Sequence, residues 1–253
     1  RAGKDVSCEK PLTLCVREGR VLADAVKEHG RVFRTDSEFR SSKAAYRLVE
    51  LVRTGHIGRL HRMVTGVPGN DVAKPMPPPM PVPGELDFDA WLGPAPERPY
   101  HVDRVHPVRN LSGRPGWMRC RDYAQGLISN WGTHLNDIAQ WGNNTDRTGP
   151  VEVSGRGQYP PADSFWNVLL DFEVEYRYAN GVRLFYQTGR PYVRFEGSEG
   201  WIQVDYPKPL TAEPASLLTA ALPSGAVRFP LKSDKRDFID AVNSRGQTLE
   251  DAE

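Results

Sequence analysis

The sequence predicts two fold classes in one chain: an α/β portion with parallel strands, then an α+β portion with an open, mainly antiparallel sheet and flanking helices. Extended segments alternate with amphipathic helices up to residue 65, which is typical of parallel βα units. The stretch "KPMPPPMPVPG" (74–84) contains too many prolines for a helix or a central strand. Many residues from 171 onward alternate between apolar and polar side chains, as strands do.

The first portion is expected to begin with an extended segment over 4–8 and a helix over 16–29. Gly30 would cap this helix, because glycine readily adopts the left-handed backbone that ends many helices. The apolar face predicted for the helix consists of Val21, Leu22, Ala25 and Val26.

A second pair of elements follows, with a strand over 31–34 and a helix capped by Ser41 or Ser42. This helix is expected to end at Gly55, and a third strand over 58–65 would continue the parallel units. The residues predicted to face inward from the helix are Ala45, Leu48, Val49 and Val52.

The proline-rich stretch opens a loop region that we expect over residues 74–110. We interpret it as a long rigid loop on the surface or over a site, since loops commonly carry functional residues. The alternative is a polyproline ligand for a groove in a partner protein. A helix is expected next, over 123–141, with Leu135, Ile138 and Ala139 in one buried stripe.

The last third predicts antiparallel hairpins. Residues 171–178 alternate apolar with charged side chains, and Asn180-Gly181 is the strongest short hairpin signal. Residues 182–188 return as the partner strand, and 192–206 predict a second hairpin. Such a sheet has one covered and one open face. A final helix is expected over 234–242.

Composition excludes several classes of protein. The 33 basic and 32 acidic residues give a net charge of +1, so a nucleic-acid partner has no electrostatic support. The sequence contains no apolar run of about 18 residues that could span a membrane. Three cysteines without metal spacing suggest neither a disulfide framework nor a zinc site. We expect a cytoplasmic protein; export is the alternative, because the first residue here need not be the gene's first.

Lys10 is the first candidate for chemistry. It stands in "CEKP" (8–11), where an extended segment gives way to a loop. A lysine at the carboxyl edge of a parallel sheet can point into a ligand cleft, and burial would lower its pKa. It could then act as a general acid or base, or donate to a substrate oxygen. The alternative is an ordinary Glu-Lys surface pair before a helix.

His134 is the second candidate, in "NWGTHLND" (130–137). Histidine titrates near neutrality, so it can accept a proton from a substrate hydroxyl. Asp137 lies three residues later on the same helical face and could orient the ring or hold a hydroxyl. The alternative is a core histidine that satisfies its own hydrogen bonds. Zinc is poorly supported, because His134 has no second ligand at helical spacing.

Three further residues could hold a hydroxylated or anionic substrate, and each could equally be structural. Asn130 lies one helical turn before His134; it can donate and accept hydrogen bonds but cannot relay a proton. The other two are Tyr123 and Arg40.

Several segments, in order, resemble the Gfo/Idh/MocA family of NAD(P)-dependent oxidoreductases. They are "AGKDVSCEKPLTL", "HGRVF", "TGHIGRL", "LDFDAWLGPAPERPY", "NWGTHLNDIAQW" and "RFEGSEGWIQVDY". The resemblance runs over nearly the whole chain, and its specificity comes from the ordered set. It implies that residues 1–55 are the C-terminal portion of a dinucleotide-binding Rossmann domain. Residues 56–253 would form the substrate domain, whose open sheet supports assembly into a homo-oligomer.

The resemblance also implies a chemistry. A hydride would pass between NAD or NADP and the hydroxyl carbon of a sugar, polyol or related small molecule. Lys10 would serve catalysis and, with Glu9 and Pro11, lie at the cofactor, while His134 would take the hydroxyl proton. Members usually carry an aspartate four residues before the histidine, where this chain has Asn130. Without that charge, we expect a lower pKa for His134.

The cofactor fingerprint is a further departure. Only nine residues precede Lys10, and no Gly-x-Gly-x-x-Gly is among them. We therefore expect this chain to be an internal portion of a longer protein and to bind NAD weakly or not at all by itself. Two alternatives to the dehydrogenase stay open: an NAD-dependent glycosidase of the same family, and a non-catalytic binding or assembly module.

Overall fold

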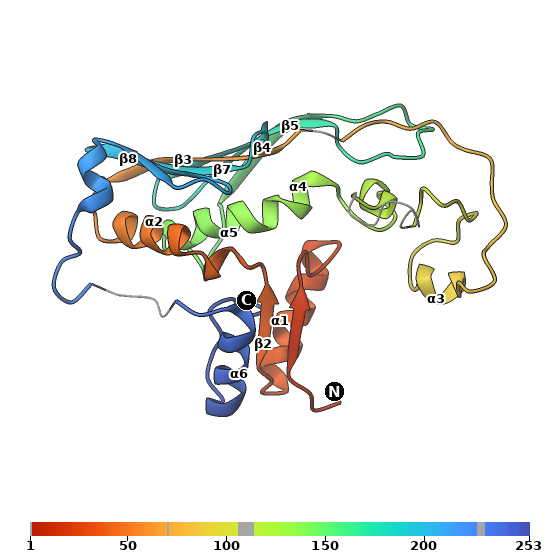
Figure 1. Cartoon of the computed structure of the whole chain (residues 1–253), viewed down its shortest axis with the longest axis horizontal. Helices are drawn as coiled ribbons and strands as arrows, with labels where there is room; N and C mark the ends of the chain where they lie inside the picture. Colours follow the sequence, from red (N-terminus) through yellow and green to blue (C-terminus); the bar gives the residue numbers. More distant parts are fainter. Residues whose placement is uncertain (1, 70, 106–113, 227–230) are drawn as a thin grey trace.

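The computed structural model describes residues 2–69, 71–105, 114–226 and 231–253. A large sheet is covered on one face by helices, and a small parallel sheet lies beyond this helical layer (Figure 1). The predicted fold class is confirmed.

The strands are β1 (Val6–Glu9), β2 (Phe33–Asp36), β3 (Leu60–Pro68), β4 (Glu152–Gln158), β5 (Asp171–Arg177), β6 (Arg183–Gly189), β7 (Tyr192–Gly197), β8 (Gly200–Asp205) and β9 (Leu210–Glu213). The α-helices are α1 (Val16–Glu28), α2 (Lys43–Arg53), α3 (Phe88–Leu92), α4 (Leu127–Asn130), α5 (Gly132–Gly142) and α6 (Asp234–Ser244). The 3-10 helices are η1 (Phe39–Ser41), η2 (Gly116–Arg119) and η3 (Ala215–Thr219).

The large sheet has the strand order β4-β5-β6-β3-β7-β8-β9. Strand β3 pairs parallel with β6, while the other neighbours pair antiparallel. Both predicted hairpins are confirmed: Asn180-Gly181 lies between β5 and β6, and Gly197 pairs with Gly200 at the β7–β8 turn. The sequence did not predict β4, because all seven of its residues are exposed and none alternates into a core.

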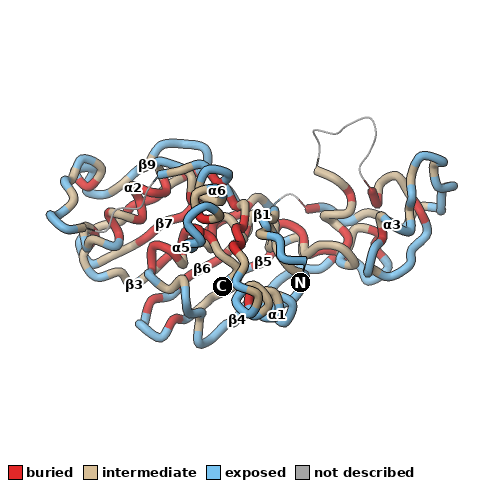
Figure 2. The backbone as a smooth tube through the Cα atoms, turned by 90° about the horizontal axis from the view of Figure 1, so that it is seen from below, coloured by how far each residue is buried: buried red, intermediate tan, exposed pale blue. Residues whose placement is uncertain are grey.

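Helices α2 and α5 cover one face of this sheet with a shared apolar core, and Figure 2 shows buried segments concentrated there. The predicted inward residues of α2 are confirmed. The largest fully buried apolar side chains include Leu48, Leu51, Leu135, Trp141 and Phe195. These contacts place α2 with the large sheet; the division of the chain at residue 55 stays a prediction.

The small sheet consists of β1 and β2, paired parallel from Val6 with Phe33 to Glu9 with Asp36. Helix α6, from the far end of the sequence, packs against β2. The expectation that the strand over 58–65 continues these parallel units is wrong. That strand is β3, which is buried from Met63 to Val67 and therefore occupies the centre of the large sheet.

Two helix predictions need correction. In α1, Leu22, Ala25 and Val26 of the predicted stripe are half-buried, but Val21 is 61% exposed and the buried residue is Ala23, which was not predicted. The helix expected over 123–141 begins only at Leu127, because Gly126 has a positive φ of 75°. From there α4 leads into α5.

The proline-rich stretch runs as an extended connection from the large sheet to the lobe that carries α3 (Figure 1). Helix α3 was not predicted; its N-cap is Asp87, whose carboxylate accepts the Ala90 N–H at 3.0 Å. Positions 106–110 of the predicted loop lie outside the described residues.

Candidate active site

Lys10 lies one residue beyond β1, at the carboxyl edge where open α/β sheets bind ligands. Its Nζ donates a hydrogen bond to the backbone carbonyl of Asn130 at 3.0 Å. Burial lowers the pKa of Lys10, while the charges of Glu9 and Glu38 act in the opposite direction. The peptide bond to Pro11 is cis. The "CEKP" segment is thus joined directly to the end of α4, 120 residues away in the sequence.

His134 lies in the first turn of α5, with its ring stacked on Phe39 at a centroid distance of 4.3 Å and an interplanar angle of 22°. Burial lowers the pKa of His134 to about 4, and the positive charge of Lys10 adds to this effect; a hydrogen bond with the Ser37 backbone opposes it. The Nδ1 atom is buried without a hydrogen-bond partner. A neutral imidazole can exchange a proton with a hydroxyl that reaches this nitrogen, which is buried here and belongs to the lining of neither cavity described below.

The low pKa of His134 has the direction expected from the missing negative charge at Asn130. The structure gives two other causes for it. Burial has the largest effect, and the second cause is the charge of Lys10. Asn130 contributes its backbone carbonyl as the acceptor for Lys10. Its predicted side-chain contact with substrate stays a prediction.

Arg40 and Asp137, both predicted to bind substrate, bind each other. Arg40 donates from Nε and Nη2 to the two Asp137 oxygens, at 2.7 and 2.6 Å, and from Nη2 to Asp146 at 2.7 Å. Burial of Arg40 acts to lower its pKa, but the charges of Asp137 and Asp146 outweigh it and raise the pKa. The roles of Arg40 and Asp137 in binding a substrate stay predictions. Their observed hydrogen bonds connect η1 with α5.

Glu250 lies next to this pair and is buried. Burial, followed by the charge of Asp137, raises the pKa of Glu250 to about 7. The Ser37 hydroxyl donates to the Glu250 carboxylate, and the Ser37 backbone hydrogen-bonds His134. A chain of polar contacts therefore runs from the C-terminal tail through β2 to the candidate base.

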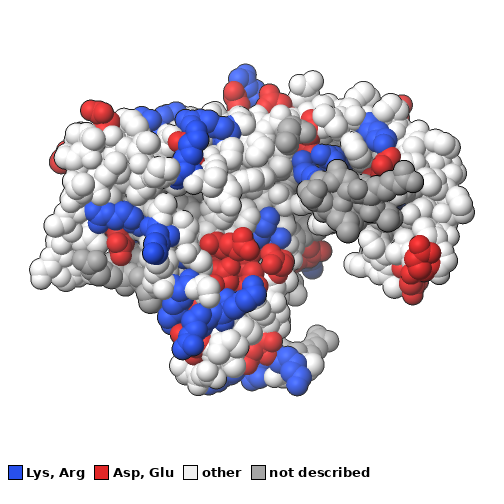
Figure 3. Space-filling model, viewed as in Figure 1, with Lys and Arg blue, Asp and Glu red and all other residues white. Residues whose placement is uncertain are grey.

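A polar cavity of about 430 Å³ adjoins these groups, and acidic side chains gather on this part of the surface (Figure 3). Its polar lining includes Ser37, Arg40, Thr133, Asp137, Asp146 and Glu250.

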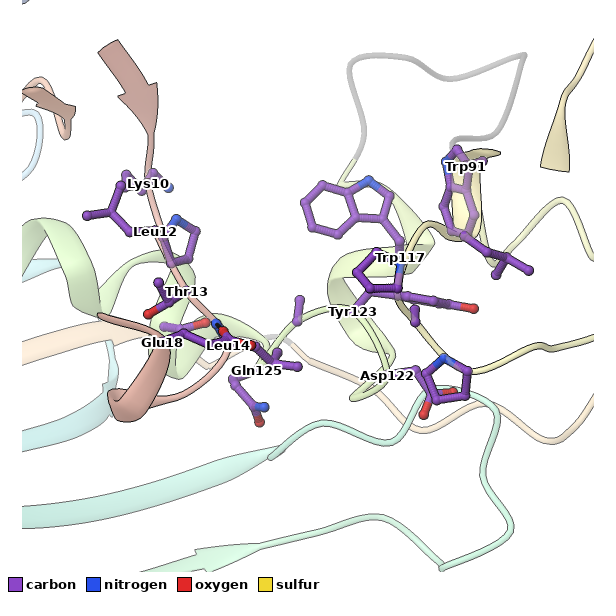
Figure 4. A pocket seen from close by; sticks show the side chains of 17 residues that line it. Lys10, Leu12, Thr13, Leu14, Glu18, Trp91, Trp117, Asp122, Tyr123 and Gln125 are labelled. Atoms are coloured by element: carbon purple, nitrogen blue, oxygen red, sulfur yellow. Dashed lines mark hydrogen bonds between the residues drawn. The ribbon is translucent and has the colours of Figure 1, made fainter. Parts of the chain in front are cut away.

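A second, larger cavity of about 680 Å³ opens beside Lys10, and we call it the aromatic cavity. Figure 4 shows Lys10, Leu12 and Thr13 on one side and Trp91, Trp117, Tyr123 and Asp122 across from them. The Tyr123 hydroxyl accepts a hydrogen bond from Arg104 Nη1 at 3.3 Å, and burial raises the pKa of Tyr123.

The structure therefore brings Lys10, Asn130 and His134 together, with Glu9 and Pro11 beside them on the chain. Tyr123 lies across the aromatic cavity, whereas Arg40 and Asp137 line the polar one. Sequence reasoning missed the residues that enclose His134 and the cavity, since they come from scattered segments without a shared motif. They include Ser37, Phe39, Trp117 and Glu250.

The described residues also bear on metal binding and on membrane insertion. No three His, Cys, Asp or Glu side chains in the described part of the chain are grouped so that they could hold a metal ion. Within the same ranges, no helix is long and apolar enough to cross a membrane.

Comparison with known families bears on this geometry. A model described as the C-terminal α/β domain of the Gfo/Idh/MocA oxidoreductase family matches residues 65–247. The chain belongs to this family. The match covers α4 and α5, and therefore His134, together with the large sheet apart from residues 60–64 at the start of β3.

Among proteins of the family, 1,5-anhydro-D-fructose reductase from Ensifer adhaerens is 37% identical over 59 residues, which are 23% of this chain and 18% of that one. Among solved structures, aldose-aldose oxidoreductase from Caulobacter crescentus, complexed with glycerol, aligns with a TM-score of 0.65 at 17% identity, covering 100% of this chain and 66% of that one. Levoglucosan dehydrogenase with NADH and L-sorbose gives 0.62 at 16% identity, covering 99% and 67%. The chain thus spans about two thirds of these structures and a smaller part of the reductase.

Proposed function

We propose that the full-length gene product is an NAD(P)-dependent oxidoreductase that acts on a hydroxyl carbon of a sugar, a polyol or a related compound. The observation that supports this most directly is the pairing of Lys10 with a buried, neutral His134 whose Nδ1 has no partner. Family membership and structural likeness to sugar oxidoreductases support the same class of reaction.

The described residues fit the nicotinamide end of the cofactor. Lys10 and Ser37 follow the carboxyl ends of two parallel strands, and the unpartnered His134 Nδ1 provides a polar group nearby. We propose that Glu9, Lys10 and Pro11 would hold this end. When bound, the nicotinamide would accept or supply the hydride.

In the oxidation direction, His134 takes the proton of the substrate hydroxyl while the hydride leaves the same carbon, which becomes a carbonyl. The imidazole is suited to this step because it is neutral at pH 7. Lys10 donates a hydrogen bond to the substrate oxygen and stabilises the negative charge that develops there. Its lowered pKa also allows it to share the proton transfer.

The test measures nicotinamide absorbance with the full-length protein, NAD or NADP and a panel of sugars and polyols. Lys10→Ala and His134→Ala should each lower kcat by roughly 100- to 10,000-fold, as expected for a lost acid–base group. Lys4→Ala and His61→Ala are matched controls, because both residues are exposed and neither lines the two cavities described above.

Full turnover in the Lys10 and His134 variants would disprove the catalytic assignment. Release of an aglycone without net NADH would identify a glycosidase instead. No change in absorbance with any substrate, together with no release of product, would favour a non-catalytic module.

We further propose that the open face of the large sheet pairs with a second copy of the chain. Stacked arginine and aromatic side chains support this surface, with Arg62 over Phe185 at 4.7 Å and Arg194 over Trp201 at 3.9 Å. Planar pairs of this kind are common at protein interfaces. Sedimentation analysis should give a multiple of the chain mass, and a concentration-independent monomer would disprove the proposal.

A further inference from the structure

One wall of the aromatic cavity comes from the lobe between β3 and α4, far along the chain from Lys10. Trp91 lies in α3, Trp117 lies in η2, and Tyr123 precedes α4. In Figure 4 these three side chains lie together, across the cavity from the segment that starts at Lys10. The site at Lys10 therefore continues into a region with large planar apolar surfaces.

The aromatic wall is held firmly in place. Trp91 stacks on Phe88 with a centroid distance of 5.6 Å and meets Tyr123 edge-on at 5.1 Å. Trp117 follows Gly116, where a Cβ would lie only 1.6 Å from the Asp103 carbonyl oxygen, so the backbone there is tightly packed against its neighbour. Rings held in this way lose little conformational entropy when they bind a ligand.

The two ends of the cavity differ in polarity. Near Lys10 the lining includes the side chains of Thr13, Glu18 and Ser129; each makes a hydrogen bond within the chain and keeps acceptor capacity for sugar hydroxyls. At the other end it is mostly apolar, with Trp91, Leu92, Pro94, Pro96 and Trp117.

The two polar side chains at the aromatic end, Asp122 and Tyr123, also make hydrogen bonds within the chain. Both oxygens of Asp122 accept hydrogen bonds from Arg98, at 2.7 and 3.2 Å. The Tyr123 hydroxyl accepts from Arg104. Among the described residues at this end, only Asp122 and Tyr123 could pair with a second sugar ring, which would present more hydroxyls than these two can satisfy, and unpaired polar groups are costly to bury. An apolar planar group matches this end better.

We propose that the site takes a glycoside with an aromatic aglycone, the sugar at Lys10 and the aryl ring against Trp91 and Trp117. This inference deepens the proposed oxidoreductase function and rests on it for the sugar end.

The experiment compares phenyl glycosides with methyl glycosides and disaccharides of the same sugars, using nicotinamide absorbance of the full-length protein. The phenyl compounds should have the higher kcat/KM, by roughly three- to tenfold, chiefly through KM. Trp117→Ala and Trp91→Ala should bring the ratio of phenyl to methyl kcat/KM close to one, while Trp117→Phe retains most of it. Tyr159→Ala is the control, because Tyr159 is an exposed aromatic residue that lines neither cavity.

A binding measurement separates this inference from the proposed reaction. Saturation-transfer NMR of phenyl glycosides with residues 1–253 should show the strongest transfer at the aryl protons, and Trp117→Ala should abolish it while Trp117→Phe retains it. Turnover without an aryl preference, or with a disaccharide preference, would overturn the inference and leave the proposed function standing. Aryl binding without any turnover would support this inference and count against the function. Absence of both preference and aryl transfer would overturn it outright.

Discussion

The large and the small sheet are stabilised by different kinds of interaction. Beneath the large sheet, α2 and α5 bury a continuous set of apolar side chains. Beside the small sheet, Arg34 of β2 is fully buried and its guanidinium bonds Asp237 at 3.0 Å, Asp234 at 3.0 Å and Glu250 at 2.9 Å. Asp234 and Asp237 belong to α6, so these ion pairs connect β2, near the start of the described chain, with α6, near its end.

The difference matters because the candidate site lies between the two regions. Lys10 belongs to the small sheet, whereas His134 belongs to the helical layer of the large one. The apolar core is insensitive to pH and salt, while a buried ionic cluster depends on the charge state of each member. We therefore expect perturbations of the cluster to affect the site through Glu250 and Ser37.

The largest effect should come from Arg34→Leu. This change leaves Asp234, Asp237 and Glu250 buried without their cation, which should lower the free energy of unfolding by about 3–5 kcal/mol. Chemical denaturation of residues 1–253 at pH 7 measures it. Lowering the pH should recover part of the loss, because protonation removes the unpaired negative charge.

Two variants sharpen the comparison. Leu48→Ala in the apolar core should cost about 2–5 kcal/mol, with no recovery at low pH. Arg156→Ala removes an exposed pair with Glu173 and should cost less than about 1 kcal/mol. Equal pH dependence in the Arg34 and Leu48 variants would contradict the distinction between the two regions.

His134 should lower the free energy of unfolding when the pH is lowered. Its pKa is lowered from 6.5 to about 4 on folding, so the unfolded chain binds more protons between these values. The stability from this group is full above pH 6.5 and is lost as the pH falls toward 4, by about 3 kcal/mol. His134→Gln should remove this loss, measured by denaturation at pH values from 4 to 8.

Glu250 should act in the opposite direction. Its pKa is raised from 4.5 to about 7, so its contribution is full below pH 4.5 and is lost as the pH rises through 7. Glu250→Gln should therefore flatten the alkaline side of the profile while retaining an acceptor for Ser37. If both variants give the wild-type profile, the two groups do not titrate as inferred.

Local signals in the sequence predicted where helices and strands lie better than they predicted which other elements these pair with or pack against. The Asn180-Gly181 hairpin, the α2 stripe and the β7–β8 hairpin were predictable because turn chemistry and periodicity act over a few residues. The alternation of strands and helices alone placed β3 with the first parallel units, because strand pairing depends on residues far away in the sequence. Val21 was wrongly placed on the covered face of α1 for the same reason: apolar periodicity does not reveal which side a distant segment covers.

The sequence by itself determined the family and predicted the class of chemistry and the two residues proposed to carry it, since ordered motifs need no coordinates. Only the tertiary structure decided that Lys10 hydrogen-bonds the end of α4, that Arg40 binds Asp137, and that Trp117 faces the same cavity as Lys10. Each of these contacts joins segments about a hundred residues apart, and only the folded chain brings them together.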